Sequence, residues 1–410
     1  MAAISIITPV YNRQDFIHRP IESALRQTFQ DWELIIVDNG SHDGTSQVIE
    51  SFPDQRIKYH YYETKQGPIA ARNHGFSLAQ GQFIIFLDAD DWWADDCLSV
   101  LYNFLQSCDP DVALAHANWA FANQQGEIGI AHDSSFHLGE GLHTLVLYNP
   151  FAIHAALIRR DVIASVGGFT PLEPSLEDWE LWLKIGLKGY RFTHVPHLLA
   201  FYLWHPKSKS KDVFKRKADR LSTLDRFWQN AAIPPDIKPL RASSYATAYV
   251  DFCVSQISRQ NMKCALEEFD LALSYDLQIA EKIDTYYRLI YADQAASEGS
   301  QWERMEKLDE EQSRSRIEII LDHLVTRTLP GRSLINMDRA SYSAYLAMAQ
   351  ALYAERRMKS ARKYLVKAMH FSKSPFSSDL VYLYTKSLFP VNLLNYFHRI
   401  RHSMKTKTSL

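Results

Sequence analysis

The sequence of 410 residues is poor in cysteine and has no long apolar run. Its four cysteines are scattered and show no zinc-binding spacing, which favours reduced thiols in a cytosolic compartment. The first residues lack the charged segment, apolar core and cleavage site of a signal peptide. No purely apolar run approaches the roughly 18 residues that a membrane-spanning helix needs. We therefore expect a cytoplasmic protein and disfavour secretion and membrane spanning.

An excess of one charge is also lacking over the whole chain, because 45 basic residues face 47 acidic ones and the net charge is −2. Nothing in this balance indicates a nucleic-acid partner. Residues 1–210 hold 14 basic and 24 acidic side chains, whereas 211–410 hold 31 and 23. A hydrophobic fraction of 46% argues against general disorder, and the length predicts two or three domains of about 100–200 residues each.

Glycine-rich phosphate-binding loops are missing as well. Neither Gly-x4-Gly-Lys-Ser/Thr nor Gly-x-Gly-x2-Gly follows a predicted strand. This absence disfavours a P-loop hydrolase and an ordinary dinucleotide dehydrogenase. A nucleoside diphosphate bound by this chain would have to be neutralised by a metal ion and by isolated cations such as Arg72 or Lys65.

The first hundred residues alternate between predicted strands and helices. Apolar runs predict strands at 4–8, 32–37, 57–62 and 82–87, and helical stripes separate them. Such alternation predicts a parallel α/β sheet, whose ligands bind beyond the carboxyl ends of the strands. Two acidic turns, at Asp38 and at Asp88–Asp91, fall at such ends. Their position is the first indication of a functional site.

From about residue 210 the strand-like runs end and helical patterns follow. Two segments share a spacing, Ala265-x3-Phe269-x2-Ala272 and Ala361-x3-Leu365-x2-Ala368, and each follows another predicted helix. This resembles tetratricopeptide-like helical hairpins, with an ordinary helical bundle as the alternative. We expect an α/β domain at 1–210, a helical connection at 211–240, a helical domain at 241–385 and a basic amphipathic tail at 386–410.

The sequence FIIFLDADDWW carries the strongest chemical signal. Residues two apart in an extended segment point to one side, so Asp88 and Asp90 can converge. Two neighbouring carboxylates repel each other unless a cation or hydrogen-bond donors satisfy them. A hard divalent ion suits them, because Mg²⁺ is typically held by one or two carboxylates and substrate phosphates. A solvated acidic turn is the alternative.

Six ordered motifs span residues 3–210 and resemble those of family 2 glycosyltransferases. They are ISIITPVYNRQDF, IIVDNGSHDGT, GPIAARNHG, FIIFLDADDWW, VGGFTPLEPSLEDWELWLKI and YLWHPKS. Members of this family are inverting enzymes with the GT-A fold. The resemblance implies a GT-A domain, Rossmann-like with a mostly parallel sheet flanked by helices, followed by an all-α region that the resemblance does not cover.

The resemblance also implies a nucleotide site. Thr8, Pro9 and Tyr11 would line the base pocket, with Tyr11 against the ring, although simple packing is an alternative for Tyr11. Asp38 would accept a hydrogen bond from the base, or serve only as a turn residue. Arg72 would contact the base or the diphosphate, both of which suit a guanidinium.

The metal side of the site is implied in the same way. Asp88 would face the ribose or the metal, and Asp90 would bind Mn²⁺ or Mg²⁺ directly, with Asp91 a less favoured ligand. His205 is a candidate third ligand through its neutral imidazole. Leu203 stands where family members usually have arginine, which is a departure on the phosphate side of the site.

On the acceptor side, the resemblance makes Asp178 the general base that takes the proton of the acceptor hydroxyl. Glu177 belongs to the same acidic pair, or only favours a helix dipole. Gly168 fits a tight turn beneath the acceptor, and Trp92 would pack a sugar ring or the core. The segment 92–176 also contains candidates for specificity or ordinary packing, namely His116, Asn118, His137 and His154.

Together these features predict a metal-dependent inverting glycosyltransferase of the hexosyl or N-acetylhexosaminyl class, using a nucleotide sugar, preferably a UDP-sugar, and a glycan or lipid-linked acceptor. The alternatives are an interaction protein with a relic transferase domain and a sugar nucleotidyltransferase. The helical region offers a surface for a protein partner or self-association. The tail at 386–410 suggests peripheral contact with the inner membrane surface, or a last helix that docks on the bundle.

Overall fold

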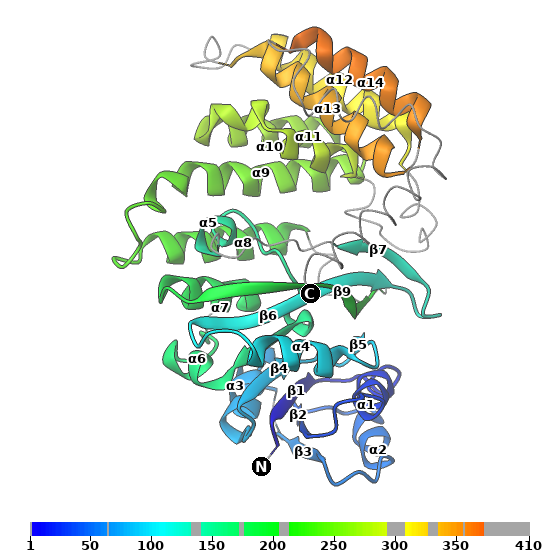
Figure 1. The fold of residues 1–410 in the computed structure, drawn as a ribbon, viewed down its shortest axis with the longest axis vertical. Helices are drawn as coiled ribbons and strands as arrows, with labels where there is room; N and C mark the ends of the chain where they lie inside the picture. The colour runs from blue at the N-terminus through cyan, green and yellow to red at the C-terminus, as the bar shows by residue number, and fades with distance from the viewer. Residues whose placement is uncertain are drawn as a thin grey trace, which may run out of the picture. The chain divides into compact units, whose positions relative to one another are not determined.

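The computed structural model describes residues 2–63, 65–132, 141–171, 176–204, 213–292, 308–326, 335–355 and 357–372 (Figure 1). The chain forms two compact units, Met1–Ser244 and Tyr245–Leu410. His205 and the tail at 386–410 lie outside the described residues. Within the described part, no helix combines the length and the apolar character needed to cross a bilayer.

The first unit is built on a nine-stranded mixed sheet in the order β3-β2-β1-β4-β8-β6-β9-β5, with β7 paired to β6. The strands are β1 (Ile4–Val10), β2 (Trp32–Asp38), β3 (Ile57–Tyr61), β4 (Phe83–Phe86), β5 (Trp92–Trp93), β6 (Val112–Ala122), β7 (Ile128–His132), β8 (Ala156–Arg159) and β9 (Arg191–Leu203).

The half of the sheet formed by β1 to β4 is parallel, as the alternating pattern predicts. Strand β1 pairs with β2 on one side and β4 on the other, and β3 extends the parallel set beyond β2. The other half is mixed, because β8 runs antiparallel to both β4 and β6, while β9 is parallel to β6. In the shared register Ile7 lies beside both Ile35 and Phe86, so the carboxyl ends of these strands meet at one edge.

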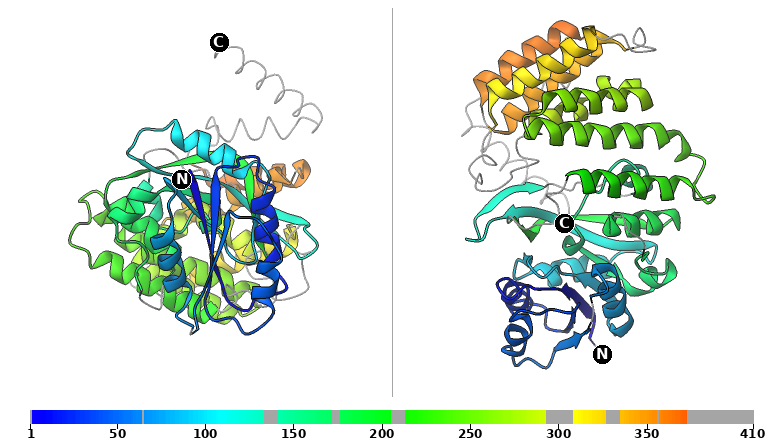
Figure 2. Two further views of the ribbon diagram at one scale, coloured as in Figure 1. Left: turned by 90° about the horizontal axis from the view of Figure 1, so that it is seen from below. Right: turned by 180° about the vertical axis from the view of Figure 1, so that it is seen from behind.

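Helices cover both faces of the parallel strands. Figures 1 and 2 show α3 (Pro68–Leu78) on one face, and α1 (His18–Leu25) and α2 (Thr45–Glu50) on the other. The strands can be buried on both faces because their sequences are almost wholly apolar. Residues from Ile4 to Ile7, from Leu34 to Val37 and from Phe83 to Leu87 are nearly all inaccessible to solvent. The predicted α/β architecture is therefore confirmed for this unit.

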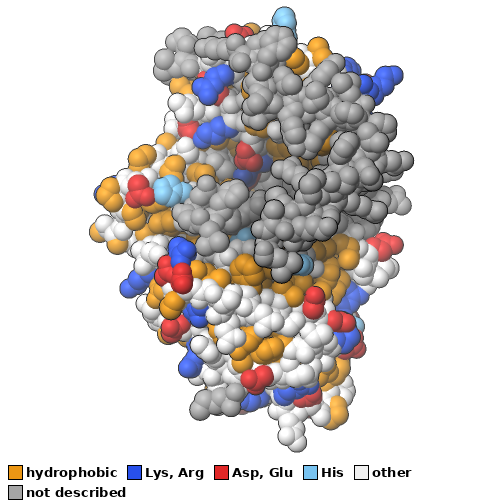
Figure 3. Space-filling model, in the orientation of Figure 1, with side chains coloured by type: hydrophobic (Ala, Val, Ile, Leu, Met, Phe, Trp, Pro, Cys, Tyr) orange, Lys and Arg blue, Asp and Glu red, His pale blue; other side chains and the backbone are white. Residues whose placement is uncertain are grey.

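The remaining helices of the first unit surround the mixed half of the sheet. They are α4 (Cys97–Gln106), α5 (Gly141–Leu145), the 3₁₀ turn η1 (Ile153–Ala155), α6 (Arg160–Ser165), α7 (Glu177–Leu187), α8 (Val213–Trp228) and the 3₁₀ turn η3 (Lys238–Leu240). Helix α8 occupies much of the segment expected as a connection. Figure 3 shows basic and acidic side chains in small mixed groups on one face of the described residues, which agrees with a net charge near zero.

The second unit is helical, as the sequence predicts. Helix α9 (Arg241–Ser258) enters it, and α10 (Met262–Tyr275), the 3₁₀ turn η4 (Leu277–Glu281), α11 (Ile283–Ile290), α12 (Glu310–Thr326), α13 (Met337–Ala354) and α14 (Met358–Phe371) follow. The residues of the repeated spacing are all buried in its core, namely Ala265, Phe269, Ala272, Ala361, Leu365 and Ala368. The small alanines let neighbouring helices approach, and the large residues fill the groove. Whether these hairpins belong to a repeat family stays a prediction.

Close contact between α3 and the sheet depends on Gly75. A Cβ atom at this position would lie 2.5 Å from Cγ2 of Ile7 and 3.3 Å from Cγ2 of Val37. Both neighbours are β-branched side chains in buried strands and have little freedom to move. Glycine therefore sets the distance at which α3 packs, and α3 carries residues of the site described below.

We predict that Gly75→Ala lowers the free energy of unfolding by about 1–3 kcal/mol, because the added methyl group overpacks the α3–sheet contact. Ser77→Ala is the matched control, since Ser77 is exposed on the same helix, and its effect should stay within about 0.5 kcal/mol. Urea denaturation of the three proteins tests this. Equal midpoints for Gly75→Ala and wild type would contradict the packing role.

Candidate functional site

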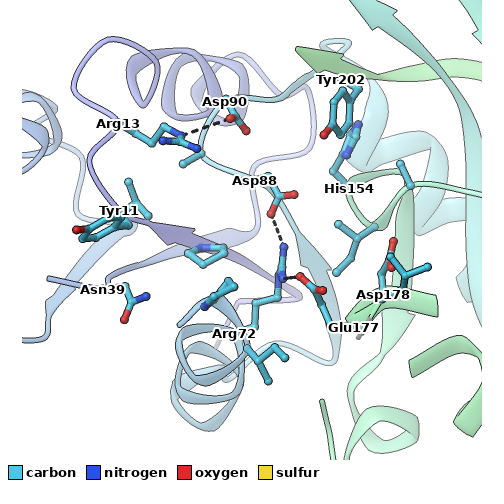
Figure 4. Close-up of a pocket in the computed structure, with 18 of the residues that line it drawn as sticks. Tyr11, Arg13, Asn39, Arg72, Asp88, Asp90, His154, Glu177, Asp178 and Tyr202 are labelled. Carbon is cyan, nitrogen blue, oxygen red and sulfur yellow. Dashed lines mark hydrogen bonds and ion pairs between the residues drawn. The ribbon is translucent and has the colours of Figure 1, made fainter. Parts of the chain in front are cut away.

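A cavity of about 420 Å³ lies at the carboxyl edge of the parallel strands (Figure 4). The ends of β1 and β2, helix α3, the turn after β4, η1 and the beginnings of α7 and α8 contribute to its walls. This volume is within the range of small-molecule sites, about 300–1,000 Å³. The polar and aromatic lining residues include Tyr11, Arg13, Asn39, Lys65, Arg72, Asp88, Asp90, His154, Glu177, Asp178 and Tyr202.

The turn after β4 directs alternate carboxylates to opposite sides. Asp88 and Asp90 both line the cavity, whereas Asp91 is buried with 1% of its surface exposed. Asp88 accepts a hydrogen bond of 2.6 Å from Nη2 of Arg72, and Oδ2 of Asp90 lies 3.4 Å from Nε of Arg13. The i, i+2 spacing therefore brings two carboxylates to one cavity, each beside an arginine.

Arg72 connects the two sides of the cavity. It projects from α3 and is only 5% exposed, and its other terminal nitrogen, Nη1, donates a 2.7 Å hydrogen bond to Oε1 of Glu177 at the start of α7. One guanidinium thus holds a carboxylate after β4 and a carboxylate 105 residues away in sequence from Arg72. Its fork of donors suits this double contact. Through these two ion pairs, Arg72 links the turn after β4 to the start of α7, in addition to lining the cavity.

Asp178 lies in the first turn of α7, next to Glu177. Its Oδ1 accepts a 2.7 Å hydrogen bond from the backbone N–H of Trp179. Its Oδ2 accepts a 3.0 Å hydrogen bond from Nδ2 of Asn149. Burial, reinforced by the negative charge of Glu177, raises the pKa of Asp178 to about 6. A carboxylate with that pKa is ionised at neutral pH and is a stronger base than an ordinary aspartate.

Asp91 pairs with a histidine inside the wall of the cavity. Its Oδ1 accepts a 2.8 Å hydrogen bond from the backbone N–H of Leu203 on β9, and its Oδ2 lies 3.1 Å from Nδ1 of His154. Burial and the charges of Asp90 and Asp88 raise the pKa of Asp91, while burial lowers the pKa of His154 to about 4. Both shifts favour the uncharged form of the side chain, so the imidazole of His154 carries no positive charge at neutral pH.

The end of the cavity formed by β1 and β2 holds Tyr11 and Asn39 (Figure 4). The ammonium of Lys65 lies 4.1 Å from the centre of the Tyr11 ring, a cation–π contact. Asn39 follows the last residue of β2, and its Oδ1 accepts a 2.7 Å hydrogen bond from the backbone N–H of Gln66. That bond fixes the orientation of the side-chain amide. Sequence reasoning missed Asn39, although its position just past a strand end was the available signal.

Of Thr8, Pro9 and Asp38, which the sequence places around the base, only Pro9 lines the cavity. Asp38 is fully buried, and its two carboxylate oxygens accept hydrogen bonds of 2.8 Å from the backbone N–H of Ser41 and from the hydroxyl of Tyr59. In this arrangement Asp38 holds the β2 turn together, and Asn39 is the neighbour that reaches the cavity.

Two other predicted site residues lie away from the cavity lining. Trp92 stacks on Phe201 at 5.6 Å, and it borders a second pocket of about 220 Å³ together with Arg19. Gly168 forms a turn with φ of +66°, where an added Cβ would meet Oδ1 of Asn73 at 2.8 Å. That turn holds Phe169 against α3, because Asn73 donates to the Phe169 carbonyl at 2.8 Å. Gly168 therefore supports the helix that carries Arg72.

No group of three histidine, cysteine or carboxylate side chains close enough to hold a metal ion is present among the described residues. Of the five carboxylates that line the cavity, those of Asp88 and Asp90 lie two residues apart on the turn after β4. A hard divalent cation commonly takes two carboxylates and completes its coordination with phosphate oxygens and water. The chemistry of this pair therefore fits such an ion, with the remaining ligands supplied by a bound substrate.

Comparison with known proteins adds independent information. The family model described as glycosyl transferase family 2 matches residues 5–164. A putative teichuronic acid biosynthesis glycosyltransferase, TuaG of Bacillus subtilis, is 30% identical over 240 residues, which cover 55% of this chain and 92% of that protein. The Escherichia coli protein named UDP-Glc:alpha-D-GlcNAc-diphosphoundecaprenol beta-1,3-glucosyltransferase WfaP is 29% identical over 215 residues, 52% of this chain and 82% of that protein.

Other similarities are narrower. An uncharacterized glycosyltransferase of Haemophilus influenzae is 38% identical over 166 residues, and this chain spans only 64% of its length. Among solved structures, the mannosyltransferase PcManGT of Pyrobaculum calidifontis, in complex with GDP-Man and Mn²⁺, has a TM-score of 0.49 at 16% identity, covering 86% of this chain and 88% of that one. A likeness at this level is too low to bear on the function of the present chain.

We predict that Arg72→Met destabilises the first unit by about 3–5 kcal/mol, since it leaves Asp88 and Glu177 facing each other without their shared cation. Arg26→Met is the matched control, because the Arg26 side chain is 51% exposed in its pair with Asp95, and its cost should be under about 1 kcal/mol. Chemical denaturation measures both. Similar losses for the two variants would contradict the structural role of Arg72.

Proposed function

Because the chain belongs to glycosyl transferase family 2, we propose that it moves a sugar from a nucleotide-sugar donor to a hydroxyl group of an acceptor, with inversion at the anomeric carbon. The observation that carries this proposal is one cavity lined by Asp88 and Asp90 from the nucleotide side and by Asp178 from α7. Such a single displacement is accelerated by stabilising the charge of the leaving group and by general-base assistance; the carboxylate pair would serve the first by holding a metal ion, and Asp178 the second.

The donor is proposed to extend along the cavity from Tyr11 toward Asp178. Tyr11 and Asn39 would receive the base, through the face of the ring and through the fixed amide. The diphosphate would then lie near Asp88 and Asp90, beside Arg13, whereas Lys65 adds positive charge at the Tyr11 end of the cavity. UDP is the preferred nucleotide, because relatives such as WfaP are named for the use of UDP-Glc.

Asp90 and Asp88 are proposed to hold Mn²⁺ or Mg²⁺ when the donor is bound. A divalent ion there would stabilise the negative charge that develops on the departing diphosphate. To receive it, Asp90 has to exchange its 3.4 Å contact with Arg13. Arg13 then remains beside the diphosphate as a second positive group.

Asp178 is proposed to act as the general base. Its carboxylate takes the proton of the acceptor hydroxyl while that oxygen attacks the anomeric carbon, and the bond between the anomeric carbon and the diphosphate oxygen breaks in the same step. No covalent enzyme intermediate is formed. Asn149 holds one carboxylate oxygen at 3.0 Å, and the pKa of about 6 leaves the group ionised at neutral pH. General-base assistance of this kind contributes about 10²–10⁴-fold in rate.

The acceptor is proposed to be a glycan or a lipid-linked sugar of polysaccharide or glycolipid biosynthesis. Relatives named for diphosphoundecaprenol-linked acceptors support this class. Helix α8 brings Lys215 and Arg216 to the cavity wall that also contains Glu177 and Asp178. Two cations at that position suit an acceptor whose sugar is attached to phosphate groups.

A panel of UDP-, GDP- and dTDP-sugars with Mn²⁺ tests the proposed reaction. The released product distinguishes the proposal from its alternatives. A glycosyltransferase releases the nucleoside diphosphate, whereas a nucleotidyltransferase would exchange pyrophosphate. Release of pyrophosphate, or binding of no sugar nucleotide, would contradict the proposal.

We predict that Asp90→Asn abolishes Mn²⁺-dependent binding of UDP while the fold survives, because an amide is a much weaker metal ligand than a carboxylate. Isothermal calorimetry of UDP with and without Mn²⁺ measures the effect. Asp95→Asn is the control, since Asp95 is 61% exposed beside Arg26 and away from the cavity. Unchanged Mn²⁺-dependent affinity in Asp90→Asn would remove Asp90 from the metal site.

We also predict that Asp178→Asn keeps its affinity for the nucleotide sugar but loses at least about 10²-fold in kcat. In the wild type, kcat should fall tenfold per pH unit below about pH 6, since protonated Asp178 cannot accept the acceptor's proton. Glu180→Gln, on the same helix turn and paired with Arg226, should retain the wild-type profile. A product with retained anomeric configuration, or a mutant that loses only donor affinity, would refute the base assignment.

A further inference from the structure

His154 is held rigidly in the wall of the cavity. It lies in the 3₁₀ turn η1, and only 1% of its surface is exposed. Its backbone carbonyl accepts a 2.7 Å hydrogen bond from the indole N–H of Trp93. Its ring is held from the other side, because Nδ1 faces Asp91 at 3.1 Å and Asp91 is itself tied to the backbone of Leu203. Both the main chain and the ring therefore have fixed positions.

The other ring nitrogen, Nε2, has no hydrogen-bond partner among the described residues, although it is inaccessible to solvent. Buried polar atoms are normally paired, so an unpaired one in a wall that lines a cavity indicates a missing partner. His154 lines the cavity beside Tyr202, whose ring centre is 6.0 Å away. Figure 4 shows its ring between Asp90 and Asp178.

A second buried histidine of the same unit provides a contrast. His116 is also inaccessible, but its ring stacks between Phe151 at 4.2 Å and His194 at 5.1 Å, and it is not among the residues that line the cavity. His116 therefore has the surroundings of a packed core residue. His154 differs because it is one of the residues that line the cavity, and its Nε2 lies just beneath that surface without a hydrogen-bond partner among the described residues.

We propose that Nε2 of His154 hydrogen-bonds a hydroxyl group of the sugar carried by the donor, and that Asp91 is the residue that positions its ring. This inference rests on the proposed transferase function and adds a sugar-binding residue to it. The ring lies past the carboxylates assigned to the metal and diphosphate and on the side of Asp178, which is where the transferred sugar would be.

The chemistry of a hydroxyl fits this nitrogen better than the other groups of the donor. In a neutral imidazole, Nε2 is an acceptor when the ring proton is on Nδ1 and a donor when Nε2 carries that proton. A sugar hydroxyl can both donate and accept, so it satisfies Nε2 in each case. A phosphate oxygen can only accept, and a metal ion requires the lone pair.

Binding measurements separate the sugar from the rest of the donor. Calorimetry with Mn²⁺ compares UDP with UDP-glucose, or with whichever UDP-sugar of the panel the wild type turns over, for wild type, His154→Gln and His154→Phe. We expect all three proteins to bind UDP within about twofold of one another. His154→Phe should bind the UDP-sugar roughly tenfold more weakly than wild type, and His154→Gln, which keeps a hydrogen-bonding group, should lose less.

Deoxy analogues of the sugar identify the contact. For one position of the sugar ring, removal of the hydroxyl should weaken binding to the wild type but not change the affinity of His154→Phe. In that variant the partner of the hydroxyl is already missing, so its removal costs nothing further. Asp91→Asn should weaken binding of the UDP-sugar, leave binding of UDP intact and change the ¹⁵N shifts of the His154 ring. The ring assignment comes from the spectrum of His154→Gln. A ring spectrum unchanged in Asp91→Asn would remove Asp91 from the positioning role.

The outcomes distinguish this inference from the function on which it rests. If the wild type binds no sugar nucleotide of the panel, the proposed function and this inference both fail. If the wild type and both His154 variants bind the UDP-sugar equally, only the role of His154 is refuted. A loss of Mn²⁺-dependent UDP binding in His154→Gln and His154→Phe, with unchanged melting temperatures, would make His154 part of the metal or diphosphate site and overturn the sugar contact.

Discussion

The site depends on the two ion pairs of Arg72. A single buried guanidinium holds Asp88, at the end of the parallel sheet, and Glu177, at the start of α7, with contacts of 2.6 and 2.7 Å. Removing a cation from such a buried arrangement is costly, because two carboxylates would be left without a counter-charge. The position of α7, and with it that of Asp178, is therefore tied to a side chain that also lines the cavity. Close packing at Gly75 holds α3, which carries Arg72, against the sheet.

Negative charge is concentrated around this link, and its distribution explains the properties of the individual carboxylates. Five of them line the cavity, namely Asp88, Asp90, Glu177, Asp178 and Asp219. The turn after β4 keeps a further one, Asp91, out of the cavity by burying it against His154. Burial and the adjacent charge of Glu177 raise the pKa of Asp178 to about 6, which suits its proposed use as a base. The carboxylates of Asp88 and Asp90 suit the proposed divalent cation.

Local patterns predicted the parts of the molecule that depend on local sequence. The apolar runs of β1, β2 and β4 and the spacing of Asp88 and Asp90 were sufficient to place two carboxylates at one edge of a sheet. These patterns could not predict that Asn39, and not Asp38, lines the cavity. Asp38 is turned inward, where it accepts a hydrogen bond from Tyr59 on the neighbouring strand. Trp92 likewise belongs to β5, which pairs with β9 more than a hundred residues later, so its side chain stacks on Phe201. Pairings over such distances leave no periodic signal along the chain.

The departure at Leu203 acquires a physical meaning in the structure. Its side chain is buried, and its backbone N–H is the donor that holds Asp91 and, through Asp91, the ring of His154. A backbone donor can be supplied by almost any residue, so this function does not require arginine at position 203. In the proposed donor site, the positive charge of such an arginine would come instead from Arg13 and Lys65, which line the same cavity. Leucine at position 203 is therefore compatible with both the support of the cavity wall and the proposed donor site.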